Sequence, residues 1–239
     1  MILIVLLLVA GAFLAAAISG AAGFGGALLL LPLLTRTVGV EQAVPMLTVA
    51  QLVGNLSRVG FGVRLVEWRS AGLFLVAALP AAAIGALSFT AMPKTLIVRL
   101  VGLAILLFVA ARLTGVLRFE RSMILLVVGG AVVGFLSGLV GSAGPLGAAI
   151  FLSLGLPPVA YIATEAVTAV GMHVVKMAVY QRELSLGREF WPLALGMGAA
   201  MVAGTWAAKR VIERIPKAIF ERLVAGLLIL ISVQMIVWP

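Results

Sequence analysis

Long apolar segments alternate with short clusters of charged residues along the whole chain. Uncharged stretches cover residues 1–35, 70–93, 122–164, 190–208 and 223–239. A helix that crosses a bilayer needs roughly 20 consecutive apolar residues, so these stretches have membrane dimensions. We therefore expect an all-α integral membrane protein. The pattern predicts helical pieces at residues 2–18, 27–35, 41–62, 70–91, 95–112, 122–136, 145–155, 158–181, 189–208 and 217–237.

A Gly-rich segment of the first half recurs in the second half. Residues 19–26 read SGAAGFGG, and residues 137–144, which lie 118 positions later, read SGLVGSAG. The same offset places Asn55 on His173. Chance similarity between apolar sequences does not predict matched polar residues at a constant offset, so we infer an internal duplication. The chain then divides into two membrane repeats of one transport domain, residues 1–118 and 119–239.

The first two pieces of each repeat are predicted to form a broken pair of helices. As one helix, residues 3–34 would be about 48 Å long, whereas the hydrocarbon core of a bilayer is roughly 30 Å thick. A Gly cluster lies in the middle of this stretch. Irregular backbone is tolerated inside a bilayer only where it is buried in protein or lines a polar cavity. Each repeat should therefore contain a broken Gly-rich helix pair followed by three transmembrane helices.

Basic residues in the loops favour an inverted second repeat. If each broken pair turns back, each repeat crosses the membrane an odd number of times, and ten basic residues share one side against five on the other. Continuous crossings would leave seven against eight, without the excess of Lys and Arg that cytoplasmic loops carry. We expect inverted-topology repeats in the cell (plasma or inner) membrane, with both termini outside. The larger set is Arg64, Arg69, Arg112, Arg118, Arg121, Lys209, Arg210, Arg214, Lys217 and Arg222, and the smaller set is Arg36, Lys94, Arg99, Arg182 and Arg188.

Composition narrows the classes of function. Of the 239 residues, 64% are hydrophobic and 10% are charged, against about 25% charged residues in soluble domains. The net charge of +9 comes from short loops rather than a continuous basic stripe, so no nucleic-acid partner is expected. The chain has no cysteine, no aspartate and a single histidine, which excludes disulfides, thiolate metal sites and a paired-aspartate protease. No metal or cofactor is predicted.

The two Gly clusters are candidate anion sites. Helices that start after each cluster would direct free N–H groups and the positive end of a helix dipole at the break. Transporter sites form where discontinuous helices meet at a repeat interface, although tight packing of small residues is an alternative explanation. The candidate substrate-binding residues in the clusters are Ser19, Gly20, Gly23, Gly25, Gly26, Ser137, Gly138, Gly141, Ser142 and Gly144.

The third helix of each repeat carries strong polar residues inside the membrane. Gln51, Asn55 and Arg58 follow i, i+4, i+7 spacing and therefore share one helix face. Lys176 corresponds to Arg58 in the second repeat. We take these four residues as candidate substrate ligands. For Arg58 and Lys176, snorkelling to the membrane surface is the alternative.

Glu165 and His173 are candidate proton-coupling residues, because ionisable groups inside a membrane are functional candidates by default. Glu165 begins its helix near the depth that Arg58 reaches, so the two side chains are able to pair. An anion that competes for Arg58 would then free the carboxylate to take a proton. For His173, a hydrogen-bonded packing role is the alternative.

Three features together are similar to those of a known family. The Ser-Gly-x-x-Gly-x-x-Gly clusters, the Pro-Lys pairs that start at positions 93 and 216, and the small size with two related halves resemble the TauE/SafE sulfite exporter family. The resemblance covers nearly the whole chain. It implies ATP-independent secondary transport of small sulfur-containing or carboxylate anions. Because Ser142 and Ala143 stand where the first cluster has Phe24 and Gly25, the two half-sites are not expected to be strictly equivalent.

The function that we expect is therefore a permease or exporter for a small anion, and not an enzyme. The chain contains no Walker-type nucleotide-binding sequence. One alternative is an intramembrane serine hydrolase that uses Ser142 and His173, although the Gly of rhomboid-type proteases two places before the Ser is missing. The other is a scaffolding membrane subunit, although the longest cytoplasmic stretch is only residues 209–217. The expected partners are a small anion and lipid, and the anion itself and the oligomeric state stay open.

Overall fold

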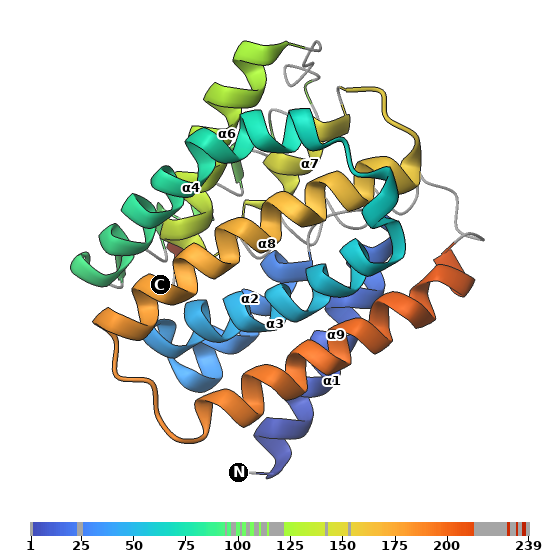
Figure 1. Ribbon diagram of the computed structural model, residues 1–239. Helices are drawn as coiled ribbons and strands as arrows, with labels where there is room; N and C mark the ends of the chain where they lie inside the picture. Colours follow the sequence, from blue (N-terminus) through green and yellow to red (C-terminus); the bar gives the residue numbers. More distant parts are fainter. Residues whose placement is uncertain are drawn as a thin grey trace.

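Helices make up the fold throughout the part of the chain that the structure describes (Figure 1). This computed structural model describes residues 2–22, 26–93, 122–141, 143–152 and 154–212, with scattered positions between 95 and 114 and between 229 and 237. The predicted pieces at 95–112 and 217–237 lie largely outside the described residues. The helices are α1 (Ile2–Ala22), α2 (Gly26–Val38), α3 (Val40–Gly62), the short 3-10 helix η1 (Val63–Leu65), α4 (Trp68–Ala91), α6 (Met123–Val140), α7 (Gly144–Leu152), α8 (Pro158–Glu183) and α9 (Phe190–Ile212).

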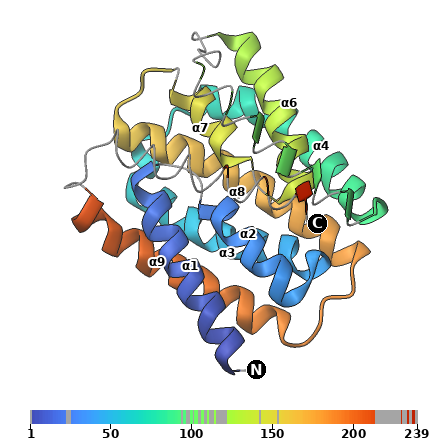
Figure 2. The same cartoon turned by 180° about the vertical axis from the view of Figure 1, so that it is seen from behind.

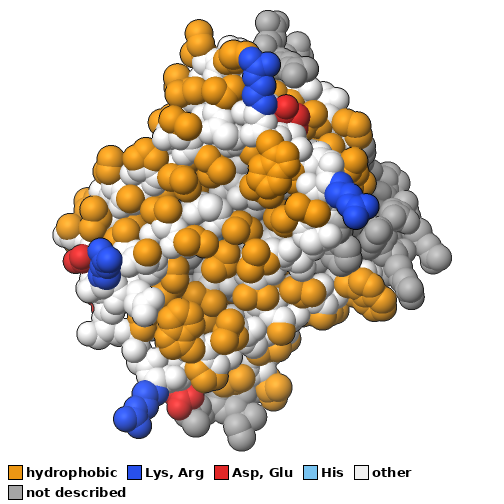
Figure 3. Space-filling model, in the orientation of Figure 1, with side chains coloured by type: hydrophobic (Ala, Val, Ile, Leu, Met, Phe, Trp, Pro, Cys, Tyr) orange, Lys and Arg blue, Asp and Glu red, His pale blue; other side chains and the backbone are white. Residues whose placement is uncertain are grey.

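The surface of these helices suits a lipid environment. Four helices are long and apolar enough to cross a membrane, over Trp68–Ala91, Met123–Val140, Val159–Glu183 and Phe190–Ala207. Large apolar side chains such as Val76 and Ile124 are exposed. Figure 3 shows a face covered mostly by hydrophobic side chains, with Lys and Arg at its edges. The predicted class of all-helical membrane protein is therefore confirmed.

Two helices continue into the Gly clusters, where the sequence predicted that they end. α1 continues through Ser19 and Gly20 to Ala22, and α6 continues through Ser137 and Gly138 to Val140. A helix-interior glycine costs only about 1 kcal/mol relative to alanine, so tertiary contacts can hold the helix together across it. α6 ends at Gly141, whose φ of 84° is a left-handed conformation that glycine adopts without steric penalty.

α4 of the first repeat packs closely against α6 of the second repeat. Gly130, Gly134 and Gly138 lie four residues apart and so share one face of α6. A Cβ at any of the three would collide with a backbone carbonyl group of α4. Gly130 lies against Phe74 and Gly138 against Ala82, so the two helices run parallel. Small residues allow this close backbone approach.

A second pair of helices joins the repeats on the other side of the molecule. α9 of the second repeat packs along α1 of the first, as Figures 1 and 2 show. A Cβ at Gly204 of α9 would collide with the carbonyl group of Phe13 of α1. Each repeat therefore supplies its fourth helical piece to the first helix of the other repeat.

Contacts between the repeats come in matched pairs. Gly171 of α8 lies against Leu75 of α4, while Val53 of α3 lies against Gly198 of α9. Val53 and Gly171 are related by the 118-residue offset, and Leu75 and Gly198 by the 123-residue offset of the Pro-Lys pairs. The glycine and the large side chain have exchanged helices, but the contact is the same. These matched contacts agree with the internal duplication inferred from the sequence.

α3 and α8 cross the middle of the molecule and run in opposite directions (Figure 1). Near the start of α3, the Gln42 side-chain nitrogen donates to the carbonyl oxygen of Ser185, which follows α8, at 3.2 Å. Near the end of α3, a Cβ at Gly62 would lie 2.8 Å from Ala163 Cβ, close to the start of α8. The C-terminal ends of α3 and α8 therefore lie at opposite ends of the molecule.

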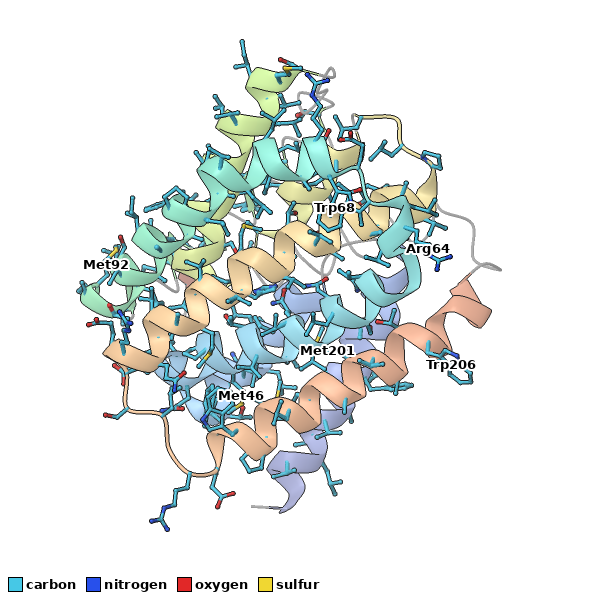
Figure 4. The ribbon with its side chains drawn as sticks, viewed as in Figure 1. Met46, Arg64, Trp68, Met92, Met201 and Trp206 are labelled. Carbon is cyan, nitrogen blue, oxygen red and sulfur yellow. The ribbon has the colours of Figure 1, made fainter. Side chains whose placement is uncertain are left out.

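This crossing separates the basic residues that follow the two helices. Arg64 lies at the same end as Trp206, whereas Met46 and Met92 lie at the other end (Figure 4). Arg182, in the last turn of α8, belongs to the end near the start of α3. Trp68 and Trp206 are among the exposed side chains, as expected for residues that anchor helices at the membrane surface.

The second helix of each repeat lies back against the first. Leu33 of α2 faces Gly11 of α1, and Ile150 of α7 faces Gly129 of α6. Gly11 and Gly129 are again related by the 118-residue offset. In both cases a glycine on the longer helix, α1 or α6, leaves space for a branched side chain of the shorter helix, α2 or α7.

Candidate functional site

Three polar side chains are buried along α3. Thr48, Gln51 and Asn55 have exposed fractions of 0%, 8% and 7%. Asn55 and Gln51 precede Gly62 by seven and eleven residues, which are close to two and three helical turns. Because Gly62 contacts α8, Gln51 and Asn55 lie on the face of α3 that meets α8.

His173 is buried on the corresponding face of α8, with an exposed fraction of 3%. It follows Val159 by fourteen residues, close to four turns, and Val159 is one of the α8 residues beside Gly62. The antiparallel register between the Gln42 contact and the Gly62 contact brings His173 to the level of Gln51 and Asn55. The structure thus brings together three of the predicted site residues at the centre of the α3–α8 pair.

Within the part of the chain that the structure describes, two buried polar atoms at this level have no hydrogen-bond partner. They are the side-chain nitrogen of Gln51, Nε2, and Nδ1 of His173. A buried polar group without a partner costs about 1–3 kcal/mol, and most such groups in proteins are satisfied. One of these atoms lies on each helix, so a polar ligand bound between α3 and α8 at this level would give both of them a partner.

Lys176 holds the end of α6. Its ammonium group is fully buried and donates to the carbonyl oxygen of Ser137 (3.3 Å), the Ser137 hydroxyl (2.9 Å) and the carbonyl oxygen of Gly141 (2.8 Å). An ammonium group has three hydrogens to donate, so these contacts use all of them. Lys176 therefore does not snorkel to the surface, and it stabilises the negative end of the α6 dipole.

Tyr180, one turn after Lys176, adds to this contact. Its hydroxyl is buried and donates to the carbonyl oxygen of Gly138 at 2.5 Å. The sequence analysis missed Tyr180, although its i+4 spacing from Lys176 was a signal that both side chains share a face. Lys176 and Tyr180 together bind three residues of the second Gly cluster, Ser137, Gly138 and Gly141. We call these five residues the α6 latch.

Arg58, near the end of α3, and Glu165, near the start of α8, are neighbours. Both side chains are partly buried, and they are close enough for the charge of Arg58 to act on Glu165. The structure therefore brings together the two residues whose pairing the sequence analysis considered.

The remaining cluster residues have varied positions. Gly23, Gly25 and Ser142 lie outside the described residues. Ser19 and Gly20 belong to the last turns of α1, while Gly26 and Gly144 begin α2 and α7. Gly138 also packs against α4, so the packing alternative holds for this glycine. Among the described residues, no group of three or more acidic or histidine side chains could hold a metal ion.

Comparison with known proteins gives one match. The family model described as sulfite exporter TauE/SafE matches residues 8–235, which confirms the resemblance seen in the sequence. Neither a curated protein nor a solved structure matches the chain.

Proposed function

Since the chain belongs to the sulfite exporter TauE/SafE family, we propose that it is an ATP-independent secondary transporter of small sulfur-containing or carboxylate anions. The binding site is formed where the α3–α8 centre faces the two Gly clusters. Gln51, Asn55 and His173 contact the anion, and the starts of α2 and α7 stabilise its charge through their dipoles.

The observation that carries this proposal is the pair of unpartnered polar atoms. Gln51 and His173 are at least nine-tenths buried, and neither the Gln51 Nε2 atom nor the His173 Nδ1 atom has a hydrogen-bond partner among the described residues. An amide NH2 group requires an acceptor, and an anion oxygen supplies one. The two groups lie on helices from different repeats, where transporter sites commonly form.

Inverted repeats with broken helix pairs are part of the proposal. The antiparallel course of α3 and α8, the matched contacts between the repeats and the returning helices α2 and α7 support this arrangement. An axis that relates two antiparallel equivalent helices lies perpendicular to them, that is, in the membrane plane. We place the protein in the plasma or inner membrane with both termini outside.

The driving force comes from gradients. At a membrane potential of about 100 mV, inside negative, the export of each negative charge is favoured by a free energy of roughly 2.3 kcal/mol. A proton is proposed to accompany the anion past the titratable side chains Glu165 and His173, either bound to one of them or carried by the anion itself. Neither the family match nor the described residues support the alternative of a hydrolase based on Ser142 and His173.

Flux into proteoliposomes tests the function. Purified protein should transport at least one of sulfite, thiosulfate, a sulfonate or a carboxylate in a radiolabelled or sensor-based assay. Gln51→Leu should lower this flux at least tenfold, because the amide donor to the anion is lost. Thr48→Val is the matched control, since the Thr48 hydroxyl is buried one turn away but donates within its own helix, to the Val44 carbonyl. Equal loss in both variants would contradict the site.

A further inference from the structure

We propose that the anion binds and crosses as a singly charged oxyanion that still carries a proton, with its O–H directed at His173 and one of its oxygens accepting from Gln51. This inference rests on the proposed transport function and specifies the form of the substrate at the same site. For sulfite, the species would be hydrogensulfite.

The charges around the site favour a single negative charge. Among the residues that the structure describes, Lys176 donates its three hydrogens to Ser137 and Gly141, and the charge of Arg58 acts on Glu165. At the centre of the α3–α8 pair there remain the uncharged amides of Gln51 and Asn55 and the imidazole of His173. A second negative charge would therefore lack a dedicated cation.

The helix dipoles also favour an anion with a single negative charge. α2 begins at Gly26 and α7 begins at Gly144, and each helix start is equivalent to about half a positive charge. Because the proposed site lies at both helix starts, together they would offset about one negative charge. The Born cost of removing an ion from water grows with the square of its charge, so burying a dianion costs about four times as much as a monoanion. The site is thus matched to one charge.

The two unpartnered atoms indicate why the bound anion should carry a proton. Gln51 Nε2 can only donate, so it requires an anion oxygen. Nδ1 of His173 accepts in one neutral tautomer and donates in the other. A protonated oxyanion has both an O–H group and acceptor oxygens, so it satisfies Nδ1 in either tautomer, whereas a fully ionised oxyanion has no hydrogen to donate.

The charged neighbours of His173 give it no other proton partner. Its own helix contributes Glu165 and Lys176, and α3 contributes Arg58. Of the other elements packed against α8, η1 has Arg64 and α4 has Arg69 in its first turn, while α6 and α7 have no titratable side chain. Of these groups, Lys176 is bound to Ser137 and Gly141, and Arg58 and Glu165 interact with each other. In each cycle, sulfite takes a proton from water on one side, crosses as hydrogensulfite and returns the proton to water on the other side.

The charge moved per sulfur tests this inference. In proteoliposomes with known sulfite gradients, the reversal potential should correspond to about one elementary charge per sulfur. Across about pH 6 to 8, the range in which histidine also titrates, the KM expressed as hydrogensulfite should stay constant, while the KM for total sulfite should rise several-fold.

Two variants show where the proton resides. In Glu165→Gln and His173→Gln, the substituted side chain cannot carry a proton. Glutamine at position 173 still donates and accepts hydrogen bonds. Both variants should therefore move about one charge per sulfur, even where turnover falls. Two charges per sulfur in either variant would mean that the replaced side chain carries the proton, and two in the wild type would mean that the dianion crosses. Either result overturns the inference and leaves transport intact. Absence of flux for every anion would instead remove the proposed function. If neither variant folds, the wild-type charge and KM relation decides.

Discussion

At the scale of single residues, the buried ammonium group of Lys176 shows how this chain tolerates charge inside a membrane. A charged side chain at the bilayer centre is costly and is found paired or bound to backbone carbonyls. Lys176 replaces hydration with two carbonyl groups and a hydroxyl of the α6 latch. Because α6 ends at Gly141, its last carbonyls lack intrahelical partners. The lysine and the helix end therefore satisfy each other.

Replacing Lys176 by Met should lower the free energy of unfolding by about 3 kcal/mol, because three buried acceptors lose a charged donor. Tyr180→Phe, which removes only the bond to the Gly138 carbonyl, should lower it by about 1 kcal/mol. Unfolding in mixed micelles measures both values. A Lys176→Met protein as stable as the wild type would show that the latch does not stabilise the fold.

Arg58 and Glu165 should depend on each other. Removing one leaves the other inside the membrane without its neighbour, at a cost of up to roughly 2.5–3.5 kcal/mol on insertion scales. Arg58→Gln and Glu165→Gln should therefore each be more destabilising than the double substitution. A double-mutant cycle of unfolding free energies measures the coupling. Effects that add within about 0.5 kcal/mol would indicate that the two residues act independently.

At the scale of helices, the contact between α4 and α6 depends on glycine. A Cβ at Gly134 would collide with the carbonyl group of Ala78, so Gly134→Ala should force the helices apart and destabilise the protein by about 2 kcal/mol. Gly72 on α4 is the matched control, because nothing lies within 4 Å of its Cβ position. Gly72→Ala should be neutral or stabilise by up to about 1 kcal/mol. Equal thermal stability of the two variants would contradict this account of the interface.

The apolar pattern predicted which segments are helical, because membrane thickness fixes the length of an apolar run. It placed the ends of α1 and α6 too early, since a glycine inside a helix is cheap when tertiary packing supports it. The spacing of Gly130, Gly134 and Gly138 was visible in the sequence, but which helix would face them was not. Spacing along one helix defines a face without naming its partner.

The candidate site was predictable only in part, for the same reason. Helical periodicity grouped Gln51 with Asn55, and the repeat offset matched Asn55 with His173. The bonds from Lys176 to Ser137 join residues 39 positions apart, and they exist because α8 passes the end of α6. A pairwise contact of this kind depends on the packing of whole helices, so the sequence suggested a substrate ligand where the structure shows a structural contact.

At the scale of the whole molecule, helices of one predicted repeat pack against helices of the other. α4 binds α6, α9 binds α1, and α3 binds α8, so neither repeat buries its apolar faces without the other. Under the proposed inverted arrangement, we expect small rotations of the two halves about the central α3–α8 pair to expose the proposed site to one side of the membrane at a time. The proposed site lies at this pair, where access from either side would be controlled.

The opposite directions of α3 and α8 make the orientation of the repeats measurable. Leu65, at the end of η1, and Gly187, after α8, are both exposed, and they follow helices whose C-terminal ends lie at opposite ends of the molecule. The chain has no cysteine, so Leu65→Cys and Gly187→Cys each provide a single label site. Since Arg64 and Arg69 belong to the larger set of basic residues, position 65 should react with a membrane-impermeant maleimide from the cytoplasmic side, and position 187 from outside. Labelling of both positions from one side would end the inverted-repeat proposal. Labelling from opposite sides in the reverse sense would keep the inverted repeats but place both termini in the cytoplasm.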